Sequence, residues 1–433
     1  MFAAMGTLIY GQRQIAACRS DMKKASKEFW EIELLSVITT TACFFVWCIV
    51  IALSDQYKVY YIVLSMTLLS TAFDITWFFM GMENIGLVVL RNTVIRLTGI
   101  GILFIFVKEK TDLLLYIALT AATGLLGNIS MWLSLKKYLV RVPVRELKIR
   151  HHLKETLIYF IPTVAMSIYT VLDKIMIGLI TNNTYENGYY EQATKIINMA
   201  KMPLHSFNTV ISSRMSFLFT SGKLDEMRSR LRDGLDFSAT FGIAISFGIL
   251  AIARTLVPVF FGPGYEEVVS ILYIAAPLVL VTCISNLIGH QYLIPSGQRA
   301  RSSKAVIAGA VCNLVLNSFF IPLLGAMGAM IASVAAQLLI TVLYIRMSEK
   351  YVTLRMVLIS IGKRCVAGLI MLAVGLLIGA RFVKTLPVLL IQIVVCAVVY
   401  IAILLAMKDD YIIRLLGQIM KKIHLLLHKE KNA

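Results

Sequence analysis

The stretch LPVLLIQIVVCAVVYIAILLAM occupies residues 386–407 and contains no charged residue. A helix needs about 20 residues of this kind to cross the ~30 Å hydrocarbon core of a bilayer. Backbone N–H and C=O groups find no water in that core, so a run of this length must satisfy its own hydrogen bonds as a helix. The sequence therefore predicts a membrane span over 386–408.

Eleven more apolar runs of similar length precede this one, and the composition agrees with them. Hydrophobic residues make up 58% of the 433 positions and charged residues 15%, whereas soluble domains hold roughly 45–50% and about 25%. The fold class predicted is all-α, a polytopic membrane helix bundle with about 12 full spans. The apolar stretch at 2–10 is too short to cross and adds an N-terminal half-span. The full spans are expected at 34–53, 60–80, 89–107, 113–134, 157–180, 189–212, 238–260, 267–289, 305–322, 326–347, 357–379 and 386–408.

The basic residues between the spans are distributed unevenly. With twelve alternating spans, 31 Lys and Arg residues lie on the side of both chain ends, 5 lie on the opposite side and 6 lie within spans. The positive-inside rule then places both ends in the cytoplasm. Topology thus explains the net charge of +18, and no nucleic-acid partner is predicted. The tail 409–433 alternates Ile/Leu with Lys/His and is expected to be an amphipathic helix on the anionic leaflet, with a frayed soluble tail as the alternative.

The predicted span 189–212 is polar along one face. A charged side chain facing lipid at the bilayer centre costs roughly 3 kcal/mol, so this face must line water, substrate or a polar neighbour. A lining for a polar or anionic substrate is the favoured interpretation. A buried network between helices, or a helix lying in the interface, is the alternative. At 100° per residue, the residues that share the arc are Glu191, Lys195, Asn198, Lys201, His205, Asn208, Thr209 and Ser212.

Ionisable candidates for the site also lie inside three other predicted spans. Asp74 is about two turns from the nearer span end, and Arg96 is deeper than Arg91, which is long enough to snorkel to the headgroups. Asp173 and Lys174 are adjacent, so their side chains diverge by about 100° on a helix and need not pair. For this last pair, a structural salt bridge and a lining role are equally open.

Motifs of catalysis and metal binding are absent from the sequence. No G-x-x-x-x-G-K-[ST], G-x-S-x-G or H-E-x-x-H occurs. These are the motifs of P-loop nucleotide binding, of hydrolases with a serine nucleophile elbow and of zinc metalloproteases. The seven cysteines form neither a C-x-x-C nor a Cys/His set with metal spacing. We therefore predict no enzyme, no catalytic residue, no metal and no cofactor.

Three groups of residues along the chain have a characteristic order and spacing. The first is FDITWFF at 73–79 with GME at 81–83 and LRN at 90–92; the second is LDKIMIG at 172–178 with GYYE at 188–191 and KI at 195–196; the third is SG at 296–297, Ala310, Asn313, LN at 316–317, IP at 321–322 and GAMGA at 325–329. Together they resemble the polysaccharide transporter (Wzx-type oligosaccharide flippase) branch of the MATE/MurJ/Wzx (MOP) superfamily. The resemblance extends over essentially the whole chain.

The resemblance implies a MATE/MurJ-like fold with two pseudo-symmetric lobes around a central cavity. The family pattern has one further N-terminal helix and a longer second helix, so the first lobe is expected to be incomplete here. Gln337 stands where the family pattern has an acid, which weakens a proton-coupling role for its span. The implied divisions are an N-terminal lobe 1–135, a basic cytoplasmic linker 136–156, a C-terminal lobe 157–347, two extra helices 348–408 and the tail 409–433.

The resemblance further implies flipping of an undecaprenyl-diphosphate-linked oligosaccharide, a surface-polysaccharide or O-antigen repeat unit, across the bacterial cytoplasmic membrane by alternating access. The implied partners are this substrate, membrane lipids, and polysaccharide polymerase and chain-length proteins. Residues implied to pair with cations or couple an ion are Asp74, Asp173 and Glu191. Candidates for substrate binding on the matching positions, together with two residues of the polar face, are Arg91, Arg96, Lys174, Lys195, Lys201, Asn198 and His205.

Three other functions remain as alternatives. A MATE-like cation-coupled exporter of small molecules is the nearest, although an excess of cations along the lining would repel cationic cargo. A membrane enzyme acting on lipid-linked sugars usually needs a large outer loop, and the predicted outer loops are only a few residues long. A non-transporting scaffold would not need the polar face at 189–212.

Overall fold

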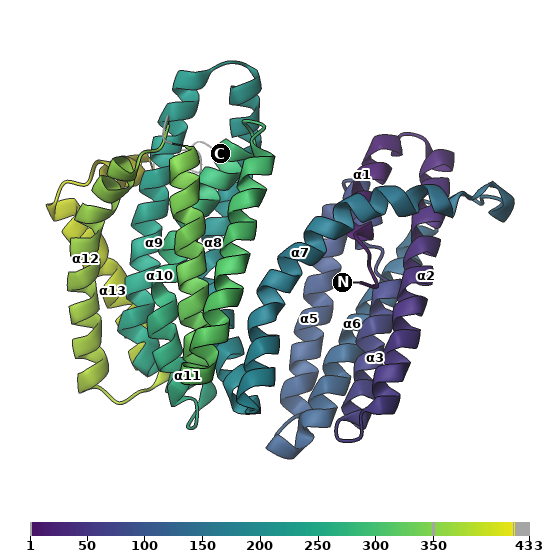
Figure 1. Cartoon of the computed structure of the whole chain (residues 1–433), viewed down its shortest axis with the longest axis horizontal. Coiled ribbons are helices and arrows are strands. Elements are labelled where there is room, and N and C mark those ends of the chain that lie inside the picture. The colour runs from purple at the N-terminus through teal and green to yellow at the C-terminus, as the bar shows by residue number, and fades with distance from the viewer. Residues whose placement is uncertain (1, 349–350, 419, 421–433) are drawn as a thin grey trace, which may run out of the picture. The chain divides into compact units, whose positions relative to one another are not determined.

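The computed structural model describes residues 2–348, 351–418 and 420, with all of their side chains except those at 9, 85, 87, 110, 144, 158–159, 161–170, 205–214, 216–217, 220 and 299. Throughout these ranges the secondary structure is helical, without a strand (Figure 1). The chain divides into two compact units, Met1–Thr170 and Val171–Ala433, here called unit 1 and unit 2. The all-helical prediction is confirmed.

Unit 1 is a bundle in which α3 packs against α2 and α6, α5 packs against α6, and the short α1 packs against α2 and α4. The last helix of this unit continues into unit 2. The elements are α1 (Thr7–Cys18), α2 (Met22–Leu53), α3 (Lys58–Ala72), α4 (Thr76–Gly81), α5 (Ile85–Phe106), η1 (Lys110–Asp112), α6 (Leu113–Leu135), η2 (Val144–Glu146) and α7 (Ile149–Thr181).

The aromatic motif at 73–79 forms the core of unit 1. Trp77 and Phe78 are fully buried, and their rings lie 5.5 and 5.0 Å from the ring of Phe29 on α2. α1 approaches this cluster so closely that a Cβ atom on Gly11 would lie 2.4 Å from the Trp77 ring. Only a residue without a side chain fits there, so glycine at this position fixes how α1 packs on α4.

The predicted span 60–80 is interrupted. α3 ends at Ala72 and α4 begins at Thr76, and the Asp74 carboxylate accepts the backbone N–H of Thr76 at 3.0 Å and its hydroxyl at 2.6 Å. A side-chain oxygen that satisfies a free N–H at a helix start stabilises that start. Asp74 therefore restarts the helix after the break.

Unit 2 is organised around α10, which packs against α8, α9 and α11; α9 also packs against α12 and α13. Its elements are α8 (Thr184–Thr220), α9 (Leu224–Phe261), α10 (Glu266–Ile288), the π-helical turn η3 (Gly289–Leu293), α11 (Arg299–Met347), α12 (Leu354–Arg381) and α13 (Leu386–Ala406).

The helix α11 contains two predicted spans, 305–322 and 326–347, joined at a break. Gly325 has φ +56° and ψ −130°, a backbone conformation that L-residues with side chains rarely adopt. After it, the backbone N–H of Ala326 donates to the carboxylate of Glu186 at 2.7 Å. Glu186 thus caps the second half of α11 from α8.

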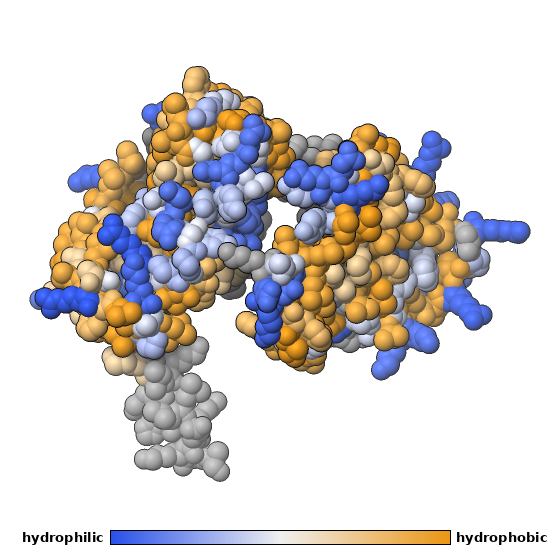
Figure 2. All heavy atoms as spheres, turned by 90° about the horizontal axis from the view of Figure 1, so that it is seen from below, coloured by the Kyte–Doolittle hydropathy of each residue, from blue (hydrophilic) through white to orange (hydrophobic). Residues whose placement is uncertain are grey.

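Apolar side chains cover much of the outer surface (Figure 2). Phe104 and Leu133, for example, are 74% and 78% exposed, which is the expected state of side chains that face lipid. Among the described residues nine helices are long and apolar enough to cross a membrane, and the one at 300–347 holds two predicted spans. The chain is a multi-pass membrane protein, as predicted.

Several helices extend well beyond the predicted spans. The spans predicted at 34–53 and 238–260 lie within α2 and α9, which begin at Met22 and Leu224. Those at 157–180 and 189–212 lie within the long helices α7 and α8, which are not among the nine apolar ones. Hydropathy identifies only the apolar part of a helix that lipid can cover, so it does not reveal how far a polar extension of that helix reaches.

Candidate functional site

The polar face of α8 is set by the way the helix packs in unit 2. As far as residue 204, its buried side chains are Tyr190, Ala193, Ile197 and Leu204, spaced three, four and seven residues apart as for one stripe of a helix. This stripe joins a core that includes residues of α10. The helix continues through Pro203. Its charged residues are thereby turned away from the core.

Three of the predicted site residues form an ion cluster on this face. Glu191 pairs with Lys174 of α7, and its other carboxylate oxygen lies 3.8 Å from the Lys195 ammonium nitrogen. All three side chains are partly exposed, at 34%, 38% and 58%, so the pairing contributes little to stability. The cluster carries two positive charges against one negative charge.

A pocket of about 270 Å³ opens beside Lys201, which lies one to two turns after Lys195 on α8. Within the part of the chain that the structure describes, Lys201 makes no ion pair. An unpaired ammonium beside amide and hydroxyl groups suits an anion such as a phosphate, which lysine binds as a point charge. The volume suits a small anionic group rather than a whole glycan. The pocket is lined by Asn198, Lys201, Met202, Leu204, Thr282, Cys283 and Asn286.

Asp173 belongs to a different environment from its neighbour Lys174. It is 5% exposed, accepts hydrogen bonds of 2.6 Å from Asn317 and from Ser333 of α11, and also accepts one from Tyr190 of α8. The divergence of the two adjacent side chains is as the helical geometry predicted. Asp173 joins α7, α8 and α11 inside unit 2.

The predicted site residues of unit 1 lie on α5 and next to the start of α4. Arg91 of α5 is half-buried and donates to Ser130 of α6 at 3.1 Å and to Asn92 at 2.8 Å. Arg96, on the same helix, is exposed, and Asp74 caps α4 as described above. The side chain of His205 lies outside the described residues.

The amide and hydroxyl groups that α10 contributes to the Lys201 pocket were not predicted from the sequence. Thr282 and Asn286 are four residues apart on α10 and so share one face. A polar pair at this spacing inside the largely apolar stretch 267–289 could have indicated these two residues. It is weak on its own, because such groups commonly bond between helices.

Comparisons with known proteins agree with this architecture. A family model described as "Polysaccharide biosynthesis protein" matches residues 1–216. A protein of Shigella dysenteriae described as "Putative O-antigen transporter" is 26% identical over 328 residues, which are 74% of this chain and 81% of that protein. A protein of Escherichia coli K12 with the same description is 24% identical over 346 residues, covering 79% and 83%.

A solved structure has the same fold. The "Lipid II flippase MurJ, inward closed conformation" superposes with a TM-score of 0.69 at 18% identity and covers 95% of this chain and 92% of its own. These findings confirm the predicted kinship with oligosaccharide flippases and the prediction of a transporter rather than an enzyme. The chain belongs to the polysaccharide biosynthesis protein family.

Proposed function

We propose that this chain flips an undecaprenyl-diphosphate-linked oligosaccharide, a surface-polysaccharide or O-antigen repeat unit, from the cytoplasmic to the outer leaflet of the bacterial cytoplasmic membrane by alternating access. The kinship with O-antigen transporters supports a lipid-linked glycan as substrate. The charge distribution between the spans supports both ends of the chain in the cytoplasm.

The observation that carries the proposal is the excess of positive charge at the polar face of α8, to which Lys174 of α7 contributes. Lys174, Lys195 and Lys201 outnumber Glu191, and the substrate we propose carries a diphosphate. A phosphate oxygen accepts strong, charge-assisted hydrogen bonds from ammonium groups. The face is unsuited to a cationic drug for the same electrostatic reason.

Glu191 has a defined part in this scheme. Without substrate, its carboxylate partly neutralises Lys174 and Lys195. A diphosphate brings the same kind of oxygen acceptors and competes with it for both ammonium groups. Glu191 therefore balances part of the positive charge until substrate arrives, and its competition for the lysines lets the substrate leave again.

The remaining residues have supporting parts. We propose that Asn198 and His205 donate hydrogen bonds to the sugar or phosphate, that Arg91 and Arg96 supply positive charge from unit 1, and that Asp173 couples an ion to the cycle. Asp173 is a buried acid, and hydrogen bonds from Asn317, Ser333 and Tyr190 hold its carboxylate in place. Polysaccharide polymerase and chain-length proteins would take up the flipped product, and no nucleic acid takes part.

The proposed division of the chain follows the same scheme. The N-terminal lobe 1–135 and the C-terminal lobe 157–347 would move against each other, joined by the linker 136–156. The additional helices 348–408 and the tail 409–433 would hold the second lobe at the membrane.

Surface polysaccharide in cells that lack their own copy of this transporter tests the proposal. Losing one charge-assisted hydrogen bond costs roughly 1.5–3 kcal/mol, about a 10- to 150-fold loss of affinity. We expect the double variant Lys195→Ala/Lys201→Ala to restore only a small fraction of the polysaccharide that the unchanged chain restores. Lys58→Ala, which removes an exposed lysine outside the polar face, is the matched control and should restore it fully.

Equal protein levels must be verified by immunoblotting in each strain. Full restoration by the double variant would refute a role for the lysine face. Restored drug resistance without restored polysaccharide would instead support the small-molecule exporter.

A further inference from the structure

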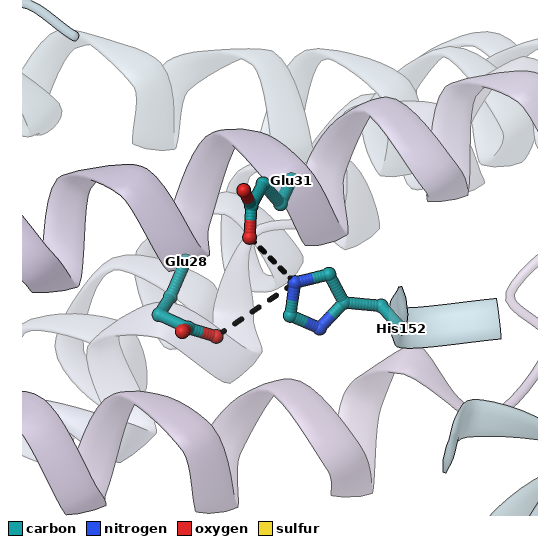
Figure 3. A group of neighbouring side chains, drawn as sticks. All are labelled: Glu28, Glu31 and His152. Atoms are coloured by element: carbon teal, nitrogen blue, oxygen red, sulfur yellow. Dashed lines mark hydrogen bonds and ion pairs between the residues drawn. The ribbon is translucent and has the colours of Figure 1, made fainter. Parts of the chain in front are cut away.

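A cluster of three side chains of kinds that can ligate a metal lies in unit 1 and shares no residue with the polar face of α8. Glu28 and Glu31 project from one side of α2, and His152 projects toward both of them from the first turn of α7 (Figure 3). The His152 Nε2 atom lies 2.7 Å from a Glu31 carboxylate oxygen and 3.9 Å from a Glu28 oxygen. All three ligand atoms lie within 4.8 Å of one another.

The cluster is poorly balanced in charge for its burial. The side chains of His152 and Glu31 are 1% and 4% exposed, and the nearest oxygen of Glu28 is buried with no hydrogen-bond partner among the described residues. The nearest ammonium, that of Lys27, lies 4.0 Å from Glu31. The buried carboxylate of Glu31 and the partly buried carboxylate of Glu28 meet at one imidazole, so a cation held between them would balance their charge.

Neighbouring residues hold two of the three groups in place, as the residues around a metal ion hold its ligands. The Tyr10 hydroxyl lies 2.8 Å from His152 Nδ1 and accepts a hydrogen bond from Gln14, and the backbone N–H of Lys148 donates to the second oxygen of Glu31. When Nδ1 donates its proton to Tyr10, the Nε2 lone pair points at the two carboxylates. A histidine ligand is usually held in this way, by a hydrogen bond from its other nitrogen.

We propose that Glu28, Glu31 and His152 bind a divalent transition-metal ion, for which Zn²⁺ is the natural probe. One imidazole nitrogen and two carboxylate oxygens, with water as the fourth ligand, make the open tetrahedral set that zinc adopts. Imidazole favours such ions over Mg²⁺ or Ca²⁺. The bound ion would fasten the start of α7, and with it the basic segment 136–148, to α2.

Metal binding by the full-length chain, purified without an affinity tag and washed with a chelator, tests the site directly. Zn²⁺ is added back, excess is removed, and the metal is counted by mass spectrometry and titrated by calorimetry. We expect one Zn²⁺ per chain and its loss in His152→Ala. His151→Ala, at the exposed neighbouring histidine, is the matched control and should bind as the unchanged chain does.

Two milder variants keep the test informative if His152→Ala folds poorly. Glu28→Gln removes one ligand charge without changing the size of the side chain and should weaken Zn²⁺ binding at least about tenfold, and Tyr10→Phe should weaken it roughly 10- to 100-fold. Zinc-free protein after reloading, or equal zinc in the unchanged chain and His152→Ala, would overturn the proposal.

Trypsin digestion gives a second readout that does not depend on transport. The segment 136–150 contains exposed Lys and Arg residues that become poorer substrates when the ion fastens the segment. We expect Zn²⁺ to slow cleavage there in the unchanged chain and in His151→Ala, but not in His152→Ala. The same cleavage rate with Zn²⁺ and with chelator in the unchanged chain would contradict the proposed ligation.

Discussion

Replacing Arg364 with alanine should destabilise unit 2 more than any surface charge change. Arg364 of α12 is 4% exposed, and its guanidinium donates to Asp236 of α9 at 2.9 Å and pairs with Asp409 at 3.2 Å. Asp409 in turn accepts the backbone N–H groups of Tyr411 and Ile412 at 3.1 Å. The arginine therefore holds α9, α12 and the helical turn after α13 together.

The magnitude follows from the burial of the partners. Removing one member of a buried ion pair costs about 3–5 kcal/mol, because the other charge stays behind without a partner. Asp409 is nearly inaccessible, whereas the side chain of Asp236 is 23% exposed and is partly screened by water. We therefore expect Arg364→Ala to lower the free energy of unfolding by about 3 kcal/mol. Arg364→Lys should lower it less, because lysine keeps the charge but lacks the planar guanidinium group that contacts two carboxylates at once.

Equilibrium unfolding in mixed micelles, titrated with SDS and followed by circular dichroism, measures this loss. Arg355→Ala, on an exposed part of the same helix, is the control and should change the unfolding free energy by less than about 0.5 kcal/mol. Equal midpoints for the Arg355 and Arg364 variants would refute the assignment of Arg364 as the link between these helices.

Three further predictions concern local features. Gly11→Ala places a Cβ atom against the Trp77 ring and should cost about 1–3 kcal/mol in the same assay; an unchanged midpoint would contradict the packing. Glu186→Ala removes the cap on Ala326 and should cost about 1 kcal/mol, whereas Glu186→Gln should retain part of it. The pKa of Asp112 is lowered because its carboxylate accepts two backbone N–H groups of the preceding turn. The ionised carboxylate therefore stabilises this turn fully at pH values above the ordinary pKa of aspartate, and the turn loosens as the pH falls through the lowered pKa of Asp112. Amide chemical shifts of the turn should titrate accordingly, and Asp112→Asn should abolish that titration.

The membrane spans were predictable because a long apolar run avoids exposing polar backbone to lipid only when it forms a helix, and such a run is visible in the local sequence. A run such as 386–408 has no other stable state in a bilayer. The separate environments of Asp173 and Lys174 were predictable for a similar reason, since helical geometry turns adjacent side chains apart. The break at Asp74 was not, because an interrupted helix and a continuous one share the same mean hydropathy.

Contacts between segments that are far apart along the chain could not be predicted from the sequence. Glu31 and His152 are 121 residues apart, and Arg364 meets partners that precede it by 128 residues and follow it by 45. Hydrophobic periodicity reports which face of a helix is buried, not which helix covers it. Each of these charged residues was therefore indistinguishable in sequence from the basic and acidic residues that simply flank a span.

Reconstitution of the purified chain measures whether it carries a lipid-linked oligosaccharide across a bilayer. The purified chain is placed in vesicles that contain a fluorescent undecaprenyl-diphosphate-linked oligosaccharide in both leaflets, and an impermeant reductant then quenches the label that reaches the outer leaflet. We predict that the chain exposes nearly all of the label, and that Lys195→Ala/Lys201→Ala exposes it much more slowly. Quenching that stops at the outer-leaflet fraction in vesicles holding folded, unchanged chain would contradict the account.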